Sequence, residues 1–281
     1  MDLDHRGPKK ILLQRYIKGN NTRTGIARMS ETTGNNGRLC NQIIRNLCVS
    51  MLAETSDLFV TYSSFDRIHQ CLGIPLFVGN RRYPTTRTVR DADFVPLLQS
   101  LKHSEEPLSE NIDANDDYFQ TREISNLLYT HLRVVQSSIR QANPFRKRYG
   151  HNRDCMVHIR LTDASHENPG LQYYTSTILS MLSSMDVLHV ATDQPSHPMI
   201  AQLMTECRPS GGAELVSLDE VETLQFGSTC KFLVLSNGSY SAVMGWLAFD
   251  ATEIHYPKYK SHMWHGDMFS IPSWKEEAIN P

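Results

Sequence analysis

The sequence lacks a strong excess of charge of either sign. It has 28 Lys and Arg residues against 30 Asp and Glu residues, and its formal net charge is −2. Binding of nucleic acid through bulk attraction needs a strongly basic surface, so this balance argues against a nucleic-acid partner. The same balance of charge is compatible with a local basic site for a phosphate group.

Cysteine is scarce and scattered, without any C-x-x-C pair. This spacing argues against a zinc knuckle or a disulfide framework and predicts reduced, mostly buried thiols. The first ten residues lack the apolar segment of a secretory signal, and no uncharged apolar run reaches the about 18 residues of a membrane span. We therefore expect a cytoplasmic protein with no transmembrane segment. The six cysteines are Cys40, Cys48, Cys71, Cys155, Cys207 and Cys230.

Two nucleotide-binding signatures are also missing. The sequence has no Gly-Lys-Ser/Thr loop, which argues against a nucleoside triphosphatase. No G-x-G-x-x-G turn follows the first expected strand at residues 10–17, which argues against a Rossmann-type oxidoreductase or methyltransferase.

The pattern that is present alternates strand-like and helix-like stretches, and it predicts an α/β fold with parallel sheets. We expect two domains, residues 1–145 and 146–281, because Pro144 and the basic residues 146–148 interrupt the apolar pattern. The second of them has a Rossmann-like succession of strand, loop and helix. Residues 81–117 are rich in proline and acidic side chains and are expected to be mostly loop. Strands are expected at 10–17, 57–62, 155–161, 186–192, 214–218, 231–236 and 253–256, and helices at 39–54, 125–142, 171–185, 198–207 and 241–249.

The clearest candidate site follows the expected strand at 155–161. His158 and Arg160 alternate with apolar residues, and Asp163 comes just after the strand. At the carboxyl end of a parallel strand such groups point to the place where α/β sheets bind ligands. Arg160 would donate to a phosphate, His158 would add a second donor, and Asp163 would hold one of them in place. The alternative is an edge strand with solvated polar side chains.

Two turns that open helices are further candidates. Residues 34–42 (GNNGRLCNQ) and 235–241 (LSNGSYS) each place glycine before a helix, where backbone N–H groups and the helix dipole attract an anion. In the first turn the candidates are Gly37 and Arg38, and in the second they are Gly238, Ser239 and Ser241. The alternative is that these residues only cap their helices.

The segment Asp91-Ala92-Asp93 resembles the D-x-D metal motif of manganese-dependent sugar transferases. No apolar strand leads into it, so we interpret it as solvated loop and expect no metal site.

These segments together resemble the α-1,2-fucosyltransferase family and its relatives, the core α-1,6- and protein O-fucosyltransferases. The family pattern G-x-L-G-N-Q corresponds to residues 37–42, with Cys40 in place of a glycine, and H-x-R-R-x-D corresponds to residues 158–163. A third pattern, S-N-S-S/T-F-S followed by a tryptophan, corresponds to residues 236–241 and Trp246, and residues 191–193 (ATD) match a further segment. The stand-alone form is similar to homologues in large DNA viruses of algae and protists, for which the compartment would be the host cytoplasm.

The resemblance implies a fold of the GT-B type, with two Rossmann-like halves facing a central cleft. It also implies an inverting, metal-independent glycosyltransferase without a cofactor, which moves a sugar from a GDP- or UDP-linked donor to a glycan or glycoprotein acceptor. Arg160 and His158 would hold the donor diphosphate, together with Gly238, Ser239 and Ser241. Asp193 would lie near the base or ribose, and Asn41 would line the cleft. For the base that activates the acceptor hydroxyl, the candidates just past the strand are Asp163, His166 and Glu167; we favour Glu167 or His166, because the family counterpart of Asp163 is structural.

One departure from the family pattern affects the donor. Leu161 replaces the second arginine and removes a cation from the expected donor pocket. Xylose or another sugar on UDP is therefore an alternative to fucose on GDP. A different class of function, a non-catalytic glycan- or nucleotide-binding protein on a degenerate transferase fold, also fits the sequence.

Overall fold

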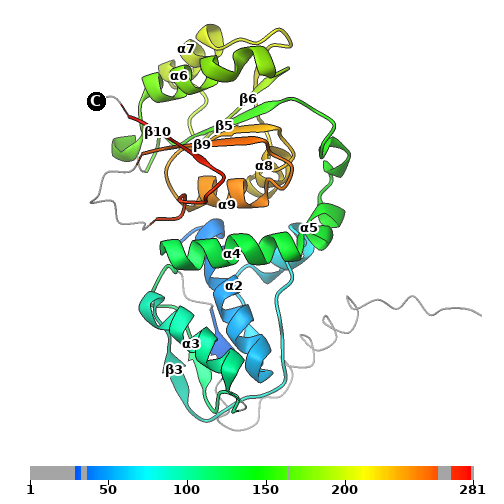
Figure 1. The fold of residues 1–281 in the computed structure, drawn as a ribbon, viewed down its shortest axis with the longest axis vertical. Helices are drawn as coiled ribbons and strands as arrows, with labels where there is room; N and C mark the ends of the chain where they lie inside the picture. The colour runs from blue at the N-terminus through cyan, green and yellow to red at the C-terminus, as the bar shows by residue number, and fades with distance from the viewer. Residues whose placement is uncertain (1–28, 33–36, 105, 164, 259–266, 280–281) are drawn as a thin grey trace, which may run out of the picture. The chain divides into compact units, whose positions relative to one another are not determined.

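The computed structural model describes residues 29–32, 37–104, 106–163, 165–258 and 267–279. Contacts divide the described chain into two compact units, each built around its own parallel sheet (Figure 1). Of the described residues, those at 29–32, 37–38, 42–65 and 76–119 form the first unit, and those at 39–41, 66–75 and from 120 onward form the second. The predicted α/β class is confirmed, and the strand expected at 10–17 lies outside the described residues.

The first unit contains a four-stranded parallel sheet in the order β2-β1-β4-β3. Helix α2 follows β1, and its apolar side chains recur every three or four residues, as predicted. Ile43, Ile44 and Leu47 are fully buried. The elements are β1 (Ser30–Glu31), α2 (Leu39–Ser56), β2 (Val60–Thr61), β3 (Thr86–Thr88), α3 (Asp91–His103) and β4 (Asn111–Asp113).

The expectation that residues 81–117 are mostly loop was wrong, because this segment holds β3, α3 and β4. The Asp93 carboxylate accepts a hydrogen bond from the Arg90 N–H at 3.2 Å, which caps the start of α3. Phe94 and Leu98 then bury one face of the helix, and Pro96 is accommodated inside it. The Asp91-Ala92-Asp93 motif is therefore the first turn of a helix rather than solvated loop.

The second unit contains a six-stranded parallel sheet in the order β10-β9-β8-β5-β6-β7. Numbered along the chain, these strands read 6-5-4-1-2-3, the order of a doubly wound Rossmann sheet. After β5 the chain adds β6 and β7 on one side of the sheet, and after β8 it adds β9 and β10 on the other side. The direction of winding therefore switches between the neighbours β5 and β8. The strands are β5 (Cys155–Ile159), β6 (Leu188–Thr192), β7 (Ala213–Leu215), β8 (Phe232–Val234), β9 (Glu253–Pro257) and β10 (Lys275–Glu277).

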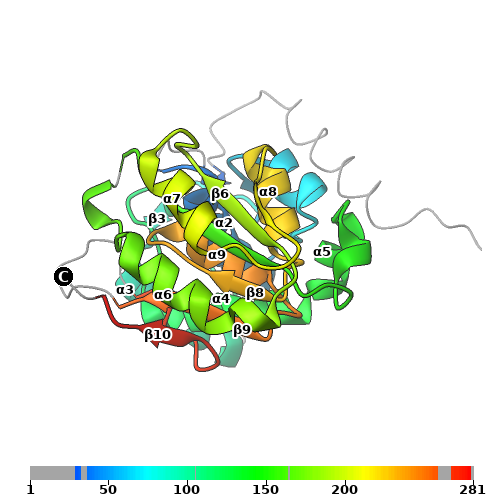
Figure 2. The ribbon, with the colours of Figure 1, turned by 90° about the horizontal axis from the view of Figure 1, so that it is seen from above.

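Helices cover both faces of this sheet. Figures 1 and 2 show α6 (Leu171–Met181) and α7 (Pro198–Glu206) on one face, and α8 (Glu220–Gly227) and α9 (Ser239–Leu247) on the other. Val157 and Ile159 of β5 belong to the core beneath α6 and α7. Because side chains alternate along a strand, His158 faces α9. The sheet of the second unit is thus covered by helices on both faces. Its strand β5 is a central strand, which contradicts the edge-strand alternative.

The helix expected at 125–142 forms two helices, α4 (Arg122–Val134) and α5 (Gln136–Ala142). Helix α5 ends before Pro144, as predicted, and Arg140 forms a two-pronged ion pair with Asp250 at 2.9 and 2.5 Å. This pair ties α5 to the loop before β9, so the boundary expected at 145/146 lies inside the second unit.

Two elements of the second unit, α8 and β10, were not expected from the sequence. Helix α8 begins with a capping box, in which Asp219 accepts from the N–H groups of Val221 and Glu222, each at 2.8 Å. Strand β10 pairs with β9, where the buried His255 contacts Glu277 at 2.7 Å.

All six cysteines have free thiols, and Cys71 is the exposed one. In the part of the chain that the structure describes, no helix is both long and apolar enough to cross a membrane.

Candidate functional site

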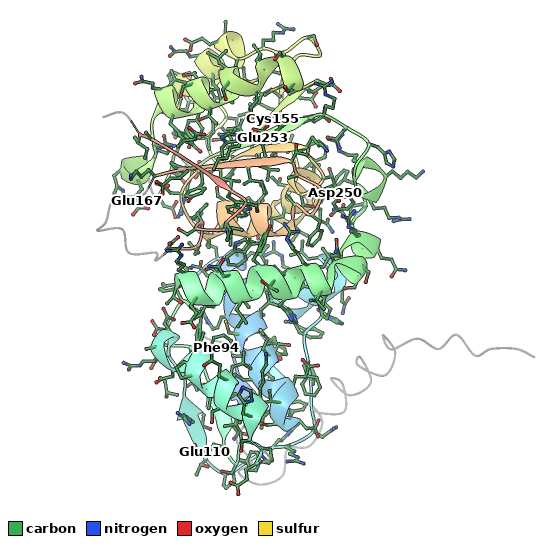
Figure 3. The ribbon with its side chains drawn as sticks, in the orientation of Figure 1. Phe94, Glu110, Cys155, Glu167, Asp250 and Glu253 are labelled. Atoms are coloured by element: carbon green, nitrogen blue, oxygen red, sulfur yellow. The ribbon has the colours of Figure 1, made fainter. Side chains whose placement is uncertain are left out.

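The candidate site lies at the carboxyl edge of the second sheet, between β5 and β8. Open α/β sheets bind ligands at the point where the winding switches direction, outside the carboxyl ends of the strands. Arg160 directly follows β5, and Gly238 lies in the turn between β8 and α9. Figure 3 shows Glu167 at this carboxyl end of the unit and Asp250 at the opposite end.

Asp163 holds Arg160 in a fixed orientation, as predicted. The guanidinium donates from Nε to Oδ1 at 2.9 Å and from Nη2 to Oδ2 at 2.8 Å. Such a two-pronged pair fixes the plane of the guanidinium as well as its position. Asp163 thereby occupies two donor atoms, and Nη1 lies on the side of the turn before α9.

Gly238 lies against that third nitrogen. A Cβ atom at Gly238 would stand 2.7 Å from Nη1 of Arg160, and the φ angle of +97° is one that residues with a side chain rarely adopt. Glycine is thus required here both for the backbone conformation and for the close approach of the guanidinium.

Helix α9 begins at this point. Among the described residues, no side chain caps its first turn. Its N–H groups and the positive end of its dipole therefore face the same place as the guanidinium. Two positive groups that converge in this way favour an anion between them.

His158 is buried beside this turn. Its Nδ1 lies 2.6 Å from the Ser241 hydroxyl, and its ring centre is 4.9 Å from that of Tyr240. Burial lowers the pKa of His158 to about 4; Asp193 opposes this shift, and Arg160 adds to it. The imidazole is therefore neutral near pH 7, and it can donate a hydrogen bond without carrying charge.

The two serines of the α9 turn have different environments. Ser239 is partly exposed at the start of the helix, where a phosphate contact is feasible. Ser241 is fully buried, and its hydroxyl oxygen accepts from the Ser236 N–H at 3.0 Å in addition to contacting His158. The structure therefore places Ser241 behind His158 and away from any ligand surface.

Asp193 holds the loop after β5 through hydrogen bonds to its carboxylate. Its carboxylate accepts from the Leu161 N–H at 2.7 Å, and from the N–H and hydroxyl of Thr162 at 3.2 and 2.5 Å. Burial raises the pKa of Asp193, but the hydrogen bonds from Thr162 and Leu161 outweigh burial, so that its pKa lies below the usual value. The Leu161 side chain is buried in the core beneath α6 and α7, so this position faces away from Arg160.

Two hydrogen bonds from side-chain amides hold the segment that contains the candidate bases. The Asn168 amide donates to the Arg160 carbonyl at 2.9 Å, and the Asn237 amide donates to the Glu167 carbonyl. The Glu167 side chain is 8% exposed, whereas that of His166 is 76% exposed. Glu167 is thus a mostly buried carboxylate in a held segment, and His166 is a mostly solvated side chain whose Nε2 lies 3.8 Å from Oε1 of Glu167.

The predicted residues of the first turn are divided between the two units. Gly37 and Arg38 belong to the first unit, where the Gly37 carbonyl accepts from the Gln42 amide at 3.1 Å. Asn41 belongs to the second unit, and its amide oxygen accepts from Gln120 at 2.9 Å.

The described residues include no group of three or more His, Cys, Asp or Glu side chains that could hold a metal ion. In the first unit, Asp93 caps α3, and Asp91 accepts from the Phe119 N–H at 2.7 Å.

Sequence reasoning missed Tyr240, Asn237 and Asn168 as parts of the site. Tyr240 and Asn237 lie within the segment 236–241 that was singled out, but their contacts with His158 and the Glu167 loop depend on the folded chain. Asn168 had no sequence signal beyond its place after the strand.

No protein-family model matches the chain, and no curated protein matches it. Among solved structures, the chain is similar to E. coli heptosyltransferase WaaC with ADP, at 9% sequence identity and a TM-score of 0.42. That match covers 89% of this chain and 92% of the other.

Proposed function

We propose that the protein is an inverting, metal-independent glycosyltransferase that moves a sugar from a nucleoside diphosphate to a glycan hydroxyl. The observation that carries this proposal is the approach of Arg160 Nη1 to Gly238 at the start of α9. A guanidinium and an open helix N-terminus at one point suit the diphosphate that leaves during glycosyl transfer.

The reaction would proceed in one displacement. Glu167 would take the proton of the acceptor hydroxyl, and the hydroxyl oxygen would bond to the anomeric carbon of the donor. The bond from that carbon to the diphosphate would break, and its electron pair would stay on the diphosphate oxygen. Arg160, the His158 Nε2–H and the N–H groups of α9 would stabilise the negative charge that develops there.

Glu167 is preferred to His166 as the base because its carboxylate is held in a nearly closed environment, in a loop pinned by Asn168 and Asn237. Asp163 is engaged with Arg160 and acts as a positioning residue.

The resemblance to fucosyltransferases supports a GT-B arrangement and a GDP-fucose donor. The Leu161 side chain lies in the core beneath α6 and α7, so its replacement of the second arginine does not decide the donor, and UDP-xylose and other UDP sugars are tested alongside GDP-fucose. A glycan or glycoprotein acceptor in the cytoplasm completes the proposal.

The test is a thermal-unfolding screen with GDP, UDP, ADP, CDP and dTDP, followed by GDP-fucose and UDP-xylose. A ligand that binds the folded chain raises its Tm according to concentration and affinity. We expect one nucleoside diphosphate to raise Tm and its sugar adduct to support transfer that EDTA does not abolish. A protein that binds glycans but no nucleoside diphosphate would be the non-catalytic binder instead, and strict dependence on Mn²⁺ would contradict the metal-independent mechanism.

A further inference from the structure

His158 is linked to the backbone of the β8–α9 turn through one hydroxyl group. The Ser236 N–H donates to the Ser241 oxygen at 3.0 Å, and the same oxygen lies 2.6 Å from Nδ1 of His158. Ser241 is fully buried and Ser236 nearly so, so water does not compete for these bonds. A hydroxyl that accepts from a backbone N–H in this way is polarised to donate its own proton.

We infer that Ser241 is a positioning residue that donates to Nδ1 of His158 and so fixes the neutral tautomer whose Nε2–H faces the donor diphosphate. The inference rests on the proposed function for the identity of the ligand, but its protein part, the tautomer, can be measured without any ligand. It assigns Ser241 to the orientation of His158 rather than to direct contact with phosphate.

The surroundings of His158 favour the uncharged ring. Arg160, one residue beyond the end of β5, is a cation that disfavours a second positive charge, and Asp193 after β6 has the opposite influence. From α9 the ring faces the phenol of Tyr240 and the hydroxyl of Ser241. Burial dominates these influences, so the imidazole is neutral over the pH range in which enzymes usually work.

A neutral hydrogen-bond donor has a chemical advantage at His158, beside Arg160. An imidazolium would repel the guanidinium and would have to lose its hydration in a buried position. A neutral Nε2–H donates to the diphosphate without that repulsion, provided that the ring is held in one tautomer. The hydroxyl of Ser241 performs this selection.

The decisive measurement is ¹⁵N NMR of the full chain labelled at histidine, with the His158 signals assigned by their loss in His158→Gln. We expect a non-protonated Nδ1 and a protonated Nε2 from pH 7.5 to pH 5.5. A protonated Nδ1, or an imidazolium at pH 6, would overturn the inference. This result comes from the unmodified protein and does not depend on whether a variant folds.

The variant test compares two buried serines. Ser241→Ala removes the hydroxyl that contacts His158, whereas Ser236→Ala removes a hydroxyl that accepts from Tyr174 at 3.0 Å and keeps the Ser236 N–H. We expect Ser241→Ala to mix the two tautomers and to weaken inorganic pyrophosphate binding about tenfold. Ser236→Ala is expected to keep the tautomer and to change that affinity by about twofold or less, and Ser241→Thr, which keeps the hydroxyl, is expected to restore the tautomer.

Titration of the unmodified protein with inorganic pyrophosphate separates the two proposals. Pyrophosphate should shift the Nε2 resonance of His158 more than its Nδ1 resonance. Binding of pyrophosphate with an Nδ1-protonated His158 would defeat the inference and leave the donor site standing. The expected tautomer without any response to pyrophosphate would defeat the donor site instead. Equal effects of Ser241→Ala and Ser236→Ala on the tautomer would show that Ser241 has only a packing role.

Discussion

Arg160 and Gly238 are 78 positions apart in the sequence, yet the guanidinium of one lies against the Cα atom of the other. This contact joins the end of β5 to the start of α9 where the winding of the sheet reverses. The relationship explains why a glycine opens α9: any side chain there would displace the cation.

Gly238→Ala tests this contact. The methyl group would stand 2.7 Å from Nη1 in a backbone conformation at φ +97°, so we expect a loss of about 1–3 kcal/mol in the free energy of unfolding and at least about tenfold weaker binding of a nucleoside diphosphate. Urea unfolding and calorimetry measure the two effects.

The matched control is Gly212→Ala. Gly212 has a similar φ of +101°, but no atom lies within 4 Å of the point that an added methyl group would occupy, so the variant carries the backbone strain without the clash. It should lose stability and keep nucleotide affinity. Equal loss of affinity in both variants would mean that strain, and not the contact with Arg160, governs binding.

Arg160→Lys separates charge from geometry. Lysine keeps the positive charge but cannot form the two-pronged pair with Asp163 while a third nitrogen faces α9. We expect transfer to fall about 100- to 1,000-fold, with Tm nearly unchanged because the side chain is partly exposed at the end of a strand.

Arg153→Lys is the companion variant. Arg153 also uses two nitrogens, which donate to the Ser184 carbonyl at 2.9 and 2.6 Å, but it precedes β5 at the amino end of the sheet. Transfer by this variant should equal that of the unmodified protein. Transfer by Arg160→Lys at the unmodified rate would remove Arg160 from the reaction.

Glu167→Gln and His166→Ala distinguish the two candidate bases. If Glu167 accepts the proton, its amide variant should lose about 100- to 10,000-fold in kcat while binding the nucleoside diphosphate normally. His166→Ala should keep kcat, because that side chain is mostly solvated and its Nε2 lies 3.8 Å from Oε1 of Glu167, outside hydrogen-bond distance. The opposite pattern in steady-state kinetics would assign the proton transfer to His166.

The buried imidazole also predicts how stability depends on pH. The folded chain keeps His158 neutral down to about pH 4, whereas the unfolded chain takes up the proton near pH 6.5. Between these values the unfolded state binds more protons, so the free energy of unfolding falls on acidification, by up to about 3 kcal/mol from this residue.

Urea unfolding at several values between pH 7 and pH 4.5 measures this fall. The comparison is His158→Gln, which lacks the titrating group and should lose stability less steeply over the same range. Parallel curves for the two proteins would contradict a depressed pKa at His158.

The sequence was informative about the elements of the second unit. Short runs of β-branched and apolar residues predicted β5, β6, β8 and β9, and the alternation with helices predicted that they pair in parallel. The strand order was not predictable, since it depends on which apolar faces pack together in the folded chain. For this reason the contact between Arg160 and Gly238 required the structure.

The misses have identifiable physical causes. Pro96 and the nearby acidic residues suggested a loop, but capping by Asp93 and the buried face of Phe94 and Leu98 stabilise α3. The hydroxyl of Ser241 was expected at the phosphate because it starts a helix. Its position two residues into α9 instead turns it inward to His158, and the direction of a side chain at a helix start depends on how the helix packs.

The distribution of thiols has a practical consequence. Burial raises the pKa of Cys40, Cys48, Cys155, Cys207 and Cys230, which keeps these groups protonated, whereas Cys71 is exposed. The thiolate is the reactive form, so a maleimide dye applied briefly near neutral pH should label the native chain at a single position. That position gives a fluorescent reporter on the second unit without any engineered cysteine.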